Sequence, residues 1–240
     1  MAKTIVVASG KGGTGKTMFV ANLGAMLSEL GKKVVLIDMD AGLRNLDLYL
    51  GLENNVVYDV YDVLTGVCRI KQAIIKDKEF DSLDFIAASP KPDDGEITPL
   101  HMKVLCNKLK KKYDYIIVDA PAGFDDNLQV AIGGADDVFI VTVPEYSSLR
   151  NAENMASNLN EQGIGSVYYV LNKVNLKLIK KGLAPELEEI PGIIKDRIVG
   201  IIQDDEDIHI ATNLGSPIVL NKESYIRHNF EKIAGRILEL

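Results

Sequence analysis

Residues 10–17 read Gly-Lys-Gly-Gly-Thr-Gly-Lys-Thr and directly follow the apolar run Thr4–Ala8 and Ser9. They match the pattern GxxxxGK[ST], in which a lysine and a hydroxyl residue end the loop. The glycines let the backbone bend so that successive N–H groups face a phosphate, and the following helix adds its positive end. We predict that the loop binds a nucleotide through Gly12, Gly13, Thr14, Gly15, Lys16, Thr17 and Met18.

The two lysines of the loop have different expected roles. Lys16 can reach the β- and γ-phosphates of ATP, and the neighbouring Thr17 hydroxyl can bind Mg²⁺. Lys11 is not required by an ordinary phosphate loop. A second lysine so close to the phosphates suggests an additional catalytic role, and a lysine that simply faces solvent is the alternative.

Short apolar runs recur along the rest of the chain and predict strands. Several of them lack polar alternation, which is typical of parallel strands buried on both faces. Helical stretches lie between them, including Phe19–Leu30, Thr98–Lys112 and Leu149–Gln162. We predict an α/β fold, a doubly wound and mainly parallel sheet flanked by helices. The expected strands are Thr4–Ala8, Val34–Ile37, Leu83–Ala87, Tyr115–Val118, Val138–Val143, Val167–Leu171 and Ile198–Ile202.

Composition limits the classes of function. The 240 residues fit one P-loop domain spanning 1–240, without a linker or repeat. The net charge of −7 argues against a fold-wide basic field for nucleic acid. Cys68 and Cys106 form no paired motif, which favours free thiols in a reducing cytoplasm. Neither a leader nor an apolar run long enough to span a membrane is expected.

Carboxylates follow two of the expected strands. Val34–Ile37 is followed by Asp38 and Asp40, and Tyr115–Val118 by Asp119. Ligands bind at the carboxyl ends of the strands in such sheets. We therefore expect Asp119 and Asp38, with Thr17, to hold Mg²⁺ and its water shell, and Asp40 to orient the attacking water. Capping or turn aspartates are the alternative.

These motifs resemble the MinD/ParA family of ATPases with a deviant Walker A loop. The resemblance rests on Lys11–Thr17, Ile37–Asp47, Val56–Asp59, Asp119–Gly123 and Pro144–Arg150, and it weakens after Lys173. The run Gly42–Asp47 is similar to the MinD branch or its flagellar relative FlhG.

The resemblance implies an ATPase that dimerises with ATP and Mg²⁺ bound and separates when ADP forms. Lys11 matches the signature lysine that reaches the partner's phosphates, and Asn172 matches the adenine-reading asparagine. It further implies spatial control of cell division, a division-inhibitor or other regulatory protein partner, and a cytoplasmic location that includes the inner face of the cell membrane.

Four positions depart from the family pattern. Met18 replaces a frequent threonine, Gln203 and Asp204 stand where a proline is common, and Asn151 replaces an aspartate that contacts partners. The segment Tyr225–Leu240 carries Ile226, Phe230, Ile233, Ala234 and Ile237 at helical spacing. Because Glu231 and Glu239 dilute its basic residues, we expect a packed final helix rather than a membrane-surface helix, and no separate membrane-targeting tail.

Three other functions share the P-loop scaffold. A FlhG-like flagellar regulator would use the same dimer switch. A ParA-like DNA-partition ATPase would need a basic surface, for which the run Lys110–Lys112 is insufficient. A ligase of the dethiobiotin-synthetase type would need a second pocket for a small acid, and no motif indicates one.

Overall fold

The computed structural model describes residues 2–41, 44–91 and 97–240. Over these residues, eight strands form one sheet in the order β3-β4-β2-β5-β1-β6-β7-β8. All neighbouring strands are parallel except β3 and β4. The strands are β1 Lys3–Ala8, β2 Val34–Asp38, β3 Ile75–Lys76, β4 Leu83–Ile86, β5 Tyr115–Asp119, β6 Asp137–Thr142, β7 Ser166–Val174 and β8 Arg197–Gln203.

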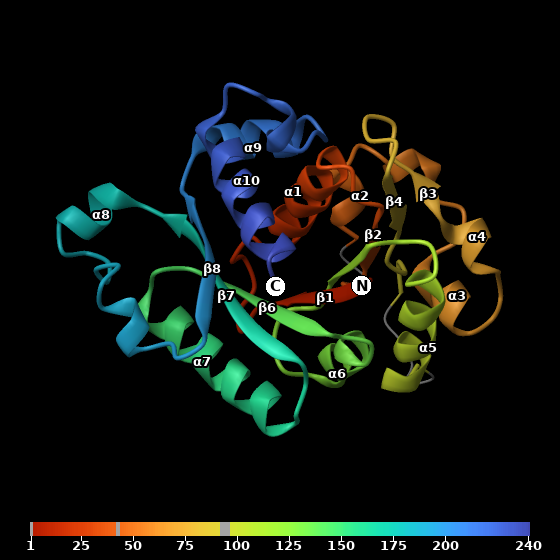
Figure 1. The fold of residues 1–240 in the computed structure, drawn as a ribbon, viewed down its shortest axis with the longest axis horizontal. Helices are drawn as coiled ribbons and strands as arrows, with labels where there is room; N and C mark the ends of the chain where they lie inside the picture. Colours follow the sequence, from red (N-terminus) through yellow and green to blue (C-terminus); the bar gives the residue numbers. More distant parts are fainter. Residues whose placement is uncertain (1, 42–43, 92–96) are drawn as a thin grey trace.

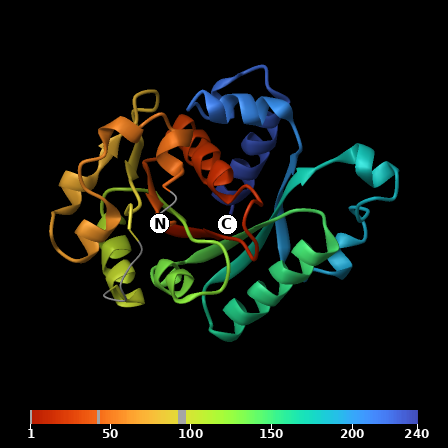
Figure 2. The same ribbon diagram turned by 180° about the vertical axis from the view of Figure 1, so that it is seen from behind.

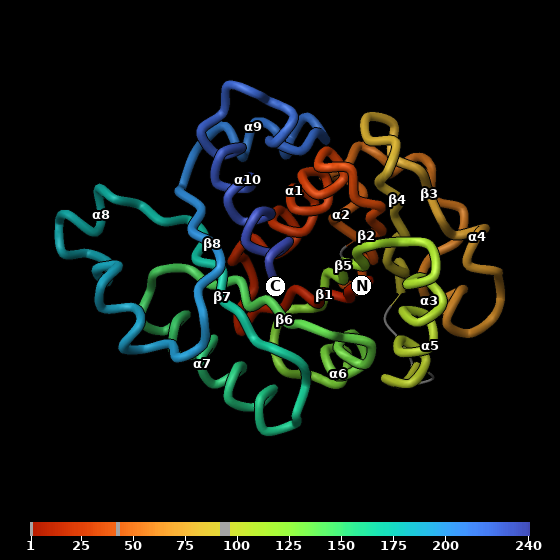
Figure 3. Tube along the Cα trace, viewed as in Figure 1, coloured from red at the N-terminus to blue at the C-terminus, as the bar shows by residue number. Residues whose placement is uncertain are grey.

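Helices cover both faces of the sheet, as Figures 1 and 2 show from opposite sides. One face carries α1 Lys16–Glu29, α2 Leu46–Tyr49, α9 Glu206–Asn213 and α10 Tyr225–Leu238, and the other carries α3 Val60–Leu64, α4 Ile70–Ala73, α5 Pro99–Leu109, α6 Asp126–Ile132 and α7 Tyr146–Glu161. Helix α8, Leu176–Lys180, projects at one side (Figure 3). Short 3₁₀ turns are Glu53–Asn55, Ile190–Gly192 and η3, Ile218–Leu220.

Each face of the sheet has its own hydrophobic core. Val6 and Ala8 of β1 pack with α5, α6 and α7, whereas Ile5 and Val7 pack with α1 and α10. Strands buried on both faces have no polar side to alternate with. The doubly wound sheet predicted from the unbroken apolar runs is therefore confirmed.

Two expectations about elements were wrong in detail. The two-residue strand β3, which pairs antiparallel with β4 at the sheet edge, was not predicted. Helix α7 begins at Tyr146, three residues before the expected Leu149, because the extended backbone of Glu145 ends the preceding segment. The residues Tyr146-Ser147-Ser148 carry little of the apolar stripe that predicts a helix.

The last helix packs its apolar stripe on the sheet. Its five predicted stripe residues, Ile226, Phe230, Ile233, Ala234 and Ile237, are all buried. Phe230 stacks against Phe19 of α1 with ring centroids 5.9 Å apart. This agrees with the expected packed helix, because the stripe is covered by the domain's own core.

Candidate nucleotide-binding site

The loop at residues 10–17 joins β1 to α1. Gly13 and Gly15 have φ angles of 79° and 91°, a region that residues with a side chain seldom adopt. Gly15 is the N-cap of α1, and among the described residues no side chain caps it. The first N–H groups of α1 are thus left for an anion.

Lys16 lies against a buried carboxylate. Its Nζ donates to Oδ1 of Asp119 at 3.1 Å, and both side chains are almost fully buried. Asp38 stands directly beside Asp119, because the two residues are register partners in β2 and β5. The predicted metal-binding carboxylates and the loop lysine are therefore neighbours.

Backbone groups hold Asp38 in place. Its Oδ1 accepts from the N–H of Asp40 at 2.9 Å, and its Oδ2 accepts from the N–H of Leu46 at 3.3 Å. Burial, and next the charge of Asp119, raise the pKa of Asp38 to about 8. Burial also raises the pKa of Asp40, with a contribution from Asp119, while Lys16 opposes the shift. A buried carboxylate such as Asp38, with Asp119 directly beside it, is suited to bind a divalent cation that supplies the missing positive charge.

A cleft of about 1030 Å³ runs along this edge of the sheet. The loop lines it through Gly12–Met18, and Asp40 lines it as well. Residues from later in the chain also line it, namely Asn172, Gln203, Asp204, Ile208 and His209. The departures Met18, Gln203 and Asp204 thus belong to the cleft, while Asp119 is buried against Lys16 with Asp38 next to it.

Asn172 lies inside β7, and its amide contacts the phosphate loop. Its Nδ2 donates to the Thr14 carbonyl at 2.8 Å, which uses one of the two amide hydrogens. Its buried Oδ1 has no partner among the described residues and can accept from a base amino group.

Several buried polar atoms around the cleft fit the expected ligand. Asp119 Oδ2, Asn172 Oδ1, Thr14 Oγ1 and Ser9 Oγ all lack a partner among the residues described. Buried polar atoms are seldom left unpaired. A free carboxylate oxygen beside Asp38 fits Mg²⁺, and the other atoms surround the place of a nucleotide, so the residues fit Mg·ATP or Mg·ADP.

Lys11 points away from this cleft. Its Nζ lies 3.7 Å from Oε2 of Glu145, just before α7, and both side chains are more than half exposed. An exposed pair of this kind adds little stability. Lys11 is therefore free to exchange partners, unlike the buried Lys16.

The loop after β5 touches the phosphate loop. The N–H of Gly123 donates to the Ser9 carbonyl at 2.9 Å, and Pro121 and Ala122 line the cleft. On the other side, a Cβ added to Gly10 would lie 3.1 Å from the backbone of Asn151 in α7. Both contacts tie neighbouring elements to the nucleotide site. Gly42 and Leu43, from the family-specific run, lie outside the described residues.

Two residues that contact the phosphate loop, Lys173 and Glu145, were not predicted from the sequence as site residues. Lys173 Nζ donates to the Gly13 carbonyl at 2.9 Å. Glu145, quoted only as part of a family motif, is the partner of Lys11. The sequence shows both residues, Lys173 next to Asn172 and Glu145 close to an expected helix. Their contacts with the loop depend on the fold and leave no local signal.

Residues 2–164 match a family model described as an AAA domain. The septum site-determining protein MinD of Bacillus subtilis is 40% identical, covering 99% of this chain and 90% of the relative. MinD in the MinC:MinD cell division protein complex of Aquifex aeolicus superposes with a TM-score of 0.92 at 38% identity, over 100% and 97% of the two chains. MinD of Pyrococcus horikoshii complexed with Mg-ADP gives 0.87 at 30% identity, over 99% and 96%.

The fold and the loop at the carboxyl edge of its sheet define a P-loop nucleotide-binding protein. The matches extend over the full length of the chain and exceed 30% identity with both sequence and structural relatives. The chain belongs to the MinD/ParA family of P-loop ATPases, and the relatives that carry this assignment are MinD proteins. In the part of the chain that is described, no helix combines the length and apolar character needed to cross a membrane.

Proposed function

We propose that this chain is a MinD-like cell-division ATPase that binds Mg·ATP, dimerises and hydrolyses ATP to ADP and phosphate. The observation that carries the proposal is the opposite orientation of two lysines in one loop. Lys16 is buried within its own site, whereas Lys11 is exposed at the rim. The whole-chain match to MinD favours this function over the flagellar, DNA-partition and ligase alternatives.

Within this proposal each site residue has a role. Gly12–Met18 surround the phosphates, Lys16 neutralises them, and Asn172 contacts the adenine. Thr17, Asp38 and Asp119 hold Mg²⁺, which would offset phosphate charge, and Asp40 orients the attacking water. Lys11 leaves Glu145 to reach the nucleotide of a second copy. The relative bound to Mg-ADP supports the choice of ligand.

ATP binding and dimerisation are expected to be linked, so that each one favours the other. Two triphosphates at one interface repel each other unless cations lie between them. If Lys11 from each subunit supplies that charge, the dimer is stable mainly while the γ-phosphate is present. We propose that residues 1–240 act as one such domain, since strands from the whole length of the chain join one sheet.

Light scattering tests the dimer switch. With Mg·ATP, D40A should trap a species of twice the monomer mass, because the nucleotide binds without turnover. K11A combined with D40A should remain a monomer, and K111A combined with D40A, an exposed lysine at the opposite sheet edge, should dimerise. A D40A protein that binds ATP but keeps its monomer mass would contradict the switch.

The partner and location are proposed from the relatives. The Aquifex structure is a MinC:MinD complex, which supports a regulatory protein partner for this chain. We propose that the ATP-bound dimer acts in the cytoplasm, including at the inner membrane face. Co-sedimentation with anionic liposomes and with plasmid, with and without Mg·ATP, tests this location. ATP-dependent pelleting with liposomes supports it, and pelleting with plasmid alone contradicts it.

A further inference from the structure

Two consecutive residues of β7 contact two consecutive carbonyls of the phosphate loop. Asn172 Nδ2 donates to the Thr14 carbonyl at 2.8 Å, and Lys173 Nζ donates to the Gly13 carbonyl at 2.9 Å. In a regular strand, successive side chains point to opposite faces of the sheet. Both side chains can meet one loop only if the strand is locally irregular.

The irregularity is present at this point of β7. The pairing with β8 shifts register between Leu171 and Val174, so β7 has one extra residue there, as in a β-bulge. Lys173 has a φ of 54°, a left-handed conformation that is unfavourable for a lysine. The bulge turns Lys173 toward the loop instead of away from it. Such local strain persists when surrounding contacts fix it, and it is often found at functional sites.

The two contacts act on the groups that bind phosphate. In a planar trans peptide, the carbonyl of one residue and the N–H of the next point in opposite directions. Drawing the Gly13 and Thr14 carbonyls toward β7 therefore aims the N–H groups of Thr14 and Gly15 away from it, into the loop. This part of the loop includes Gly13 and Gly15, whose positive φ angles are open to glycine and costly for other residues.

We propose that Lys173 is a positioning residue that pre-orients the phosphate loop by holding the Gly13 carbonyl. It works beside Asn172, which holds the Thr14 carbonyl from within the core. A preordered loop loses less conformational freedom when a nucleotide binds, and this raises affinity without any added contact to the ligand. The inference rests on the proposed binding of nucleotide at this loop.

Three variants separate the parts of this role. K173A removes the ammonium and keeps the unfavourable φ. K173G removes the ammonium and also relieves the backbone, because glycine adopts positive φ freely. K173R keeps a cationic donor that can reach the same carbonyl. K180A, an exposed lysine of α8, is the matched control.

Amide hydrogen exchange without nucleotide and calorimetric titration with Mg·ADP supply the two readouts. K173A should speed exchange at Thr14 and Gly15, and weaken Mg·ADP binding, each by about three- to tenfold, as for the loss of one exposed hydrogen bond. K173G should show the same losses with a higher melting temperature than K173A. K173R should restore both readouts to within about twofold of wild type, and K180A should match wild type.

The outcomes distinguish this inference from the proposed function. If wild-type protein fails to bind Mg·ADP, the proposed function itself fails. If wild type binds and K173A matches it in both readouts, Lys173 has no positioning role. If K173A weakens binding while exchange at Thr14 and Gly15 stays unchanged, Lys173 acts on the nucleotide's charge directly, and the inference is overturned. Faster exchange across the whole chain would show general destabilisation and would also overturn it.

Discussion

Gly15 is the residue at which the geometry of the phosphate loop is most restricted. Its φ is 91°, and it is the last residue before α1. A Cβ added there would lie 2.2 Å from Asn172 Nδ2, closer than atoms can approach. Any side chain would therefore both strain the backbone and displace the amide that holds the Thr14 carbonyl.

G15A should destabilise the nucleotide-free protein and weaken Mg·ADP binding at least tenfold. The left-handed conformation alone costs about 1–2 kcal/mol for a residue with a Cβ, and the Asn172 contact adds to this. Urea unfolding and calorimetry measure the two effects. G12A is the control for stability, since a Cβ there meets nothing within 4 Å, and it should change unfolding by less than about 0.5 kcal/mol.

Asp38 makes the stability of the nucleotide-free protein depend on pH. Its pKa is raised from 3.8 to about 8, mainly by burial. Between these values the folded protein holds a proton that the unfolded chain has released. The free energy of unfolding should therefore fall as pH rises through this window, and the contribution should be constant above it.

D38N should flatten that part of the pH profile because it removes the titrating group. Urea unfolding at intervals between pH 5 and about pH 9, without nucleotide or divalent cation, spans the upper part of the window. D81N, at an exposed position, is the control and should follow the wild-type slope. Equal slopes for D38N and wild type would contradict the assignment of the titration to Asp38.

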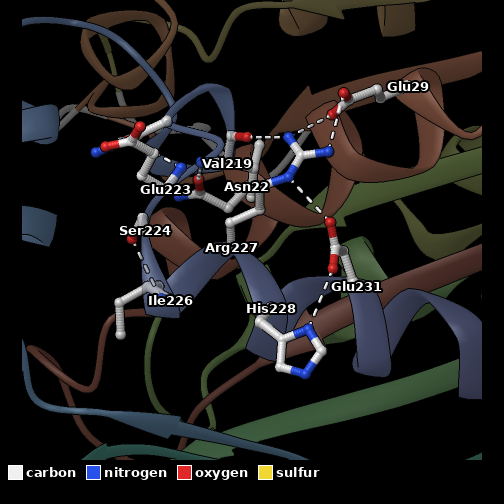
Figure 4. Close-up of polar contacts among 10 residues, drawn as sticks. Asn22, Glu29, Val219, Glu223, Ser224, Ile226, Arg227, His228 and Glu231 are labelled. Carbon is white, nitrogen blue, oxygen red and sulfur yellow. Dashed lines mark hydrogen bonds and ion pairs between the residues drawn. The ribbon is translucent and has the colours of Figure 1, made fainter.

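At the scale of elements, one arginine connects the last helix to the helix that follows the phosphate loop (Figure 4). Arg227 of α10 donates to both carboxylate oxygens of Glu29 in α1, at 2.8 and 3.0 Å, and to Glu231 at 2.9 Å. It also donates to the Val219 carbonyl of η3. The Val219 N–H in turn donates to Asn22 of α1 at 3.2 Å.

R227A should lower the free energy of unfolding by about 1–3 kcal/mol, because a part-buried carbonyl loses its donor and a two-point ion pair is lost. R227K should recover only part of this, since an ammonium cannot reproduce the paired geometry of guanidinium. K232A, an exposed lysine on the same helix, should be nearly neutral. A loss for K232A equal to that for R227A would mean that charge, rather than these contacts, matters.

The sequence predicts the long elements and fails on the short ones. Runs such as Tyr115–Val118 and the stripe from Ile226 to Ile237 are specified by local residues, and both lie where expected. Strand β3 has only two residues and depends on its pairing with β4. Helix α8 has five residues and follows its N-cap residue Asn175, whose side chain accepts from two N–H groups. Such elements depend on tertiary contacts that local patterns do not contain.

In the candidate site, too, some features could be predicted from the sequence and others could not. The positions of the loop glycines after β1, and of Asp38 and Asp119 at the ends of β2 and β5, could be predicted because they follow from where the strands end. The contact of Lys16 with Asp119 joins residues 103 positions apart, and the left-handed Lys173 has no local signal. The bond from Asn172 to the Thr14 carbonyl joins residues 158 positions apart, so it too has no local signal.

At the scale of the whole molecule, the nucleotide cleft draws on both ends of the chain. Ser9 and Gly12–Met18 line it, and so do residues between Gln203 and Gly215. Helices α1 and α10 then continue through the same core (Figure 1). A ligand in this cleft therefore contacts segments that unfolding would separate.

Mg·ADP should raise the melting temperature of the whole chain in one transition. At a ligand concentration of 100 times Kd, linkage adds about 2.7 kcal/mol, and each kcal/mol shifts Tm by about 2–4 °C for a protein of this size. Scanning calorimetry should thus show an increase of about 5–11 °C. K16A should lose most of it. A shift confined to part of a divided transition would contradict single-domain behaviour.

The contact between Lys16 and Asp119 has a consequence for the order of events. While they are paired, the ammonium is held by Oδ1 of Asp119, and Oδ2 is the one oxygen of that carboxylate left for a metal. A divalent cation held by Asp119 would weaken the attraction of the carboxylate for Lys16, and a triphosphate bound by Lys16 would free the second carboxylate oxygen for the metal. Binding of either ligand would therefore free a group that the other one needs. Metal and nucleotide should bind synergistically, and neither should bind tightly alone.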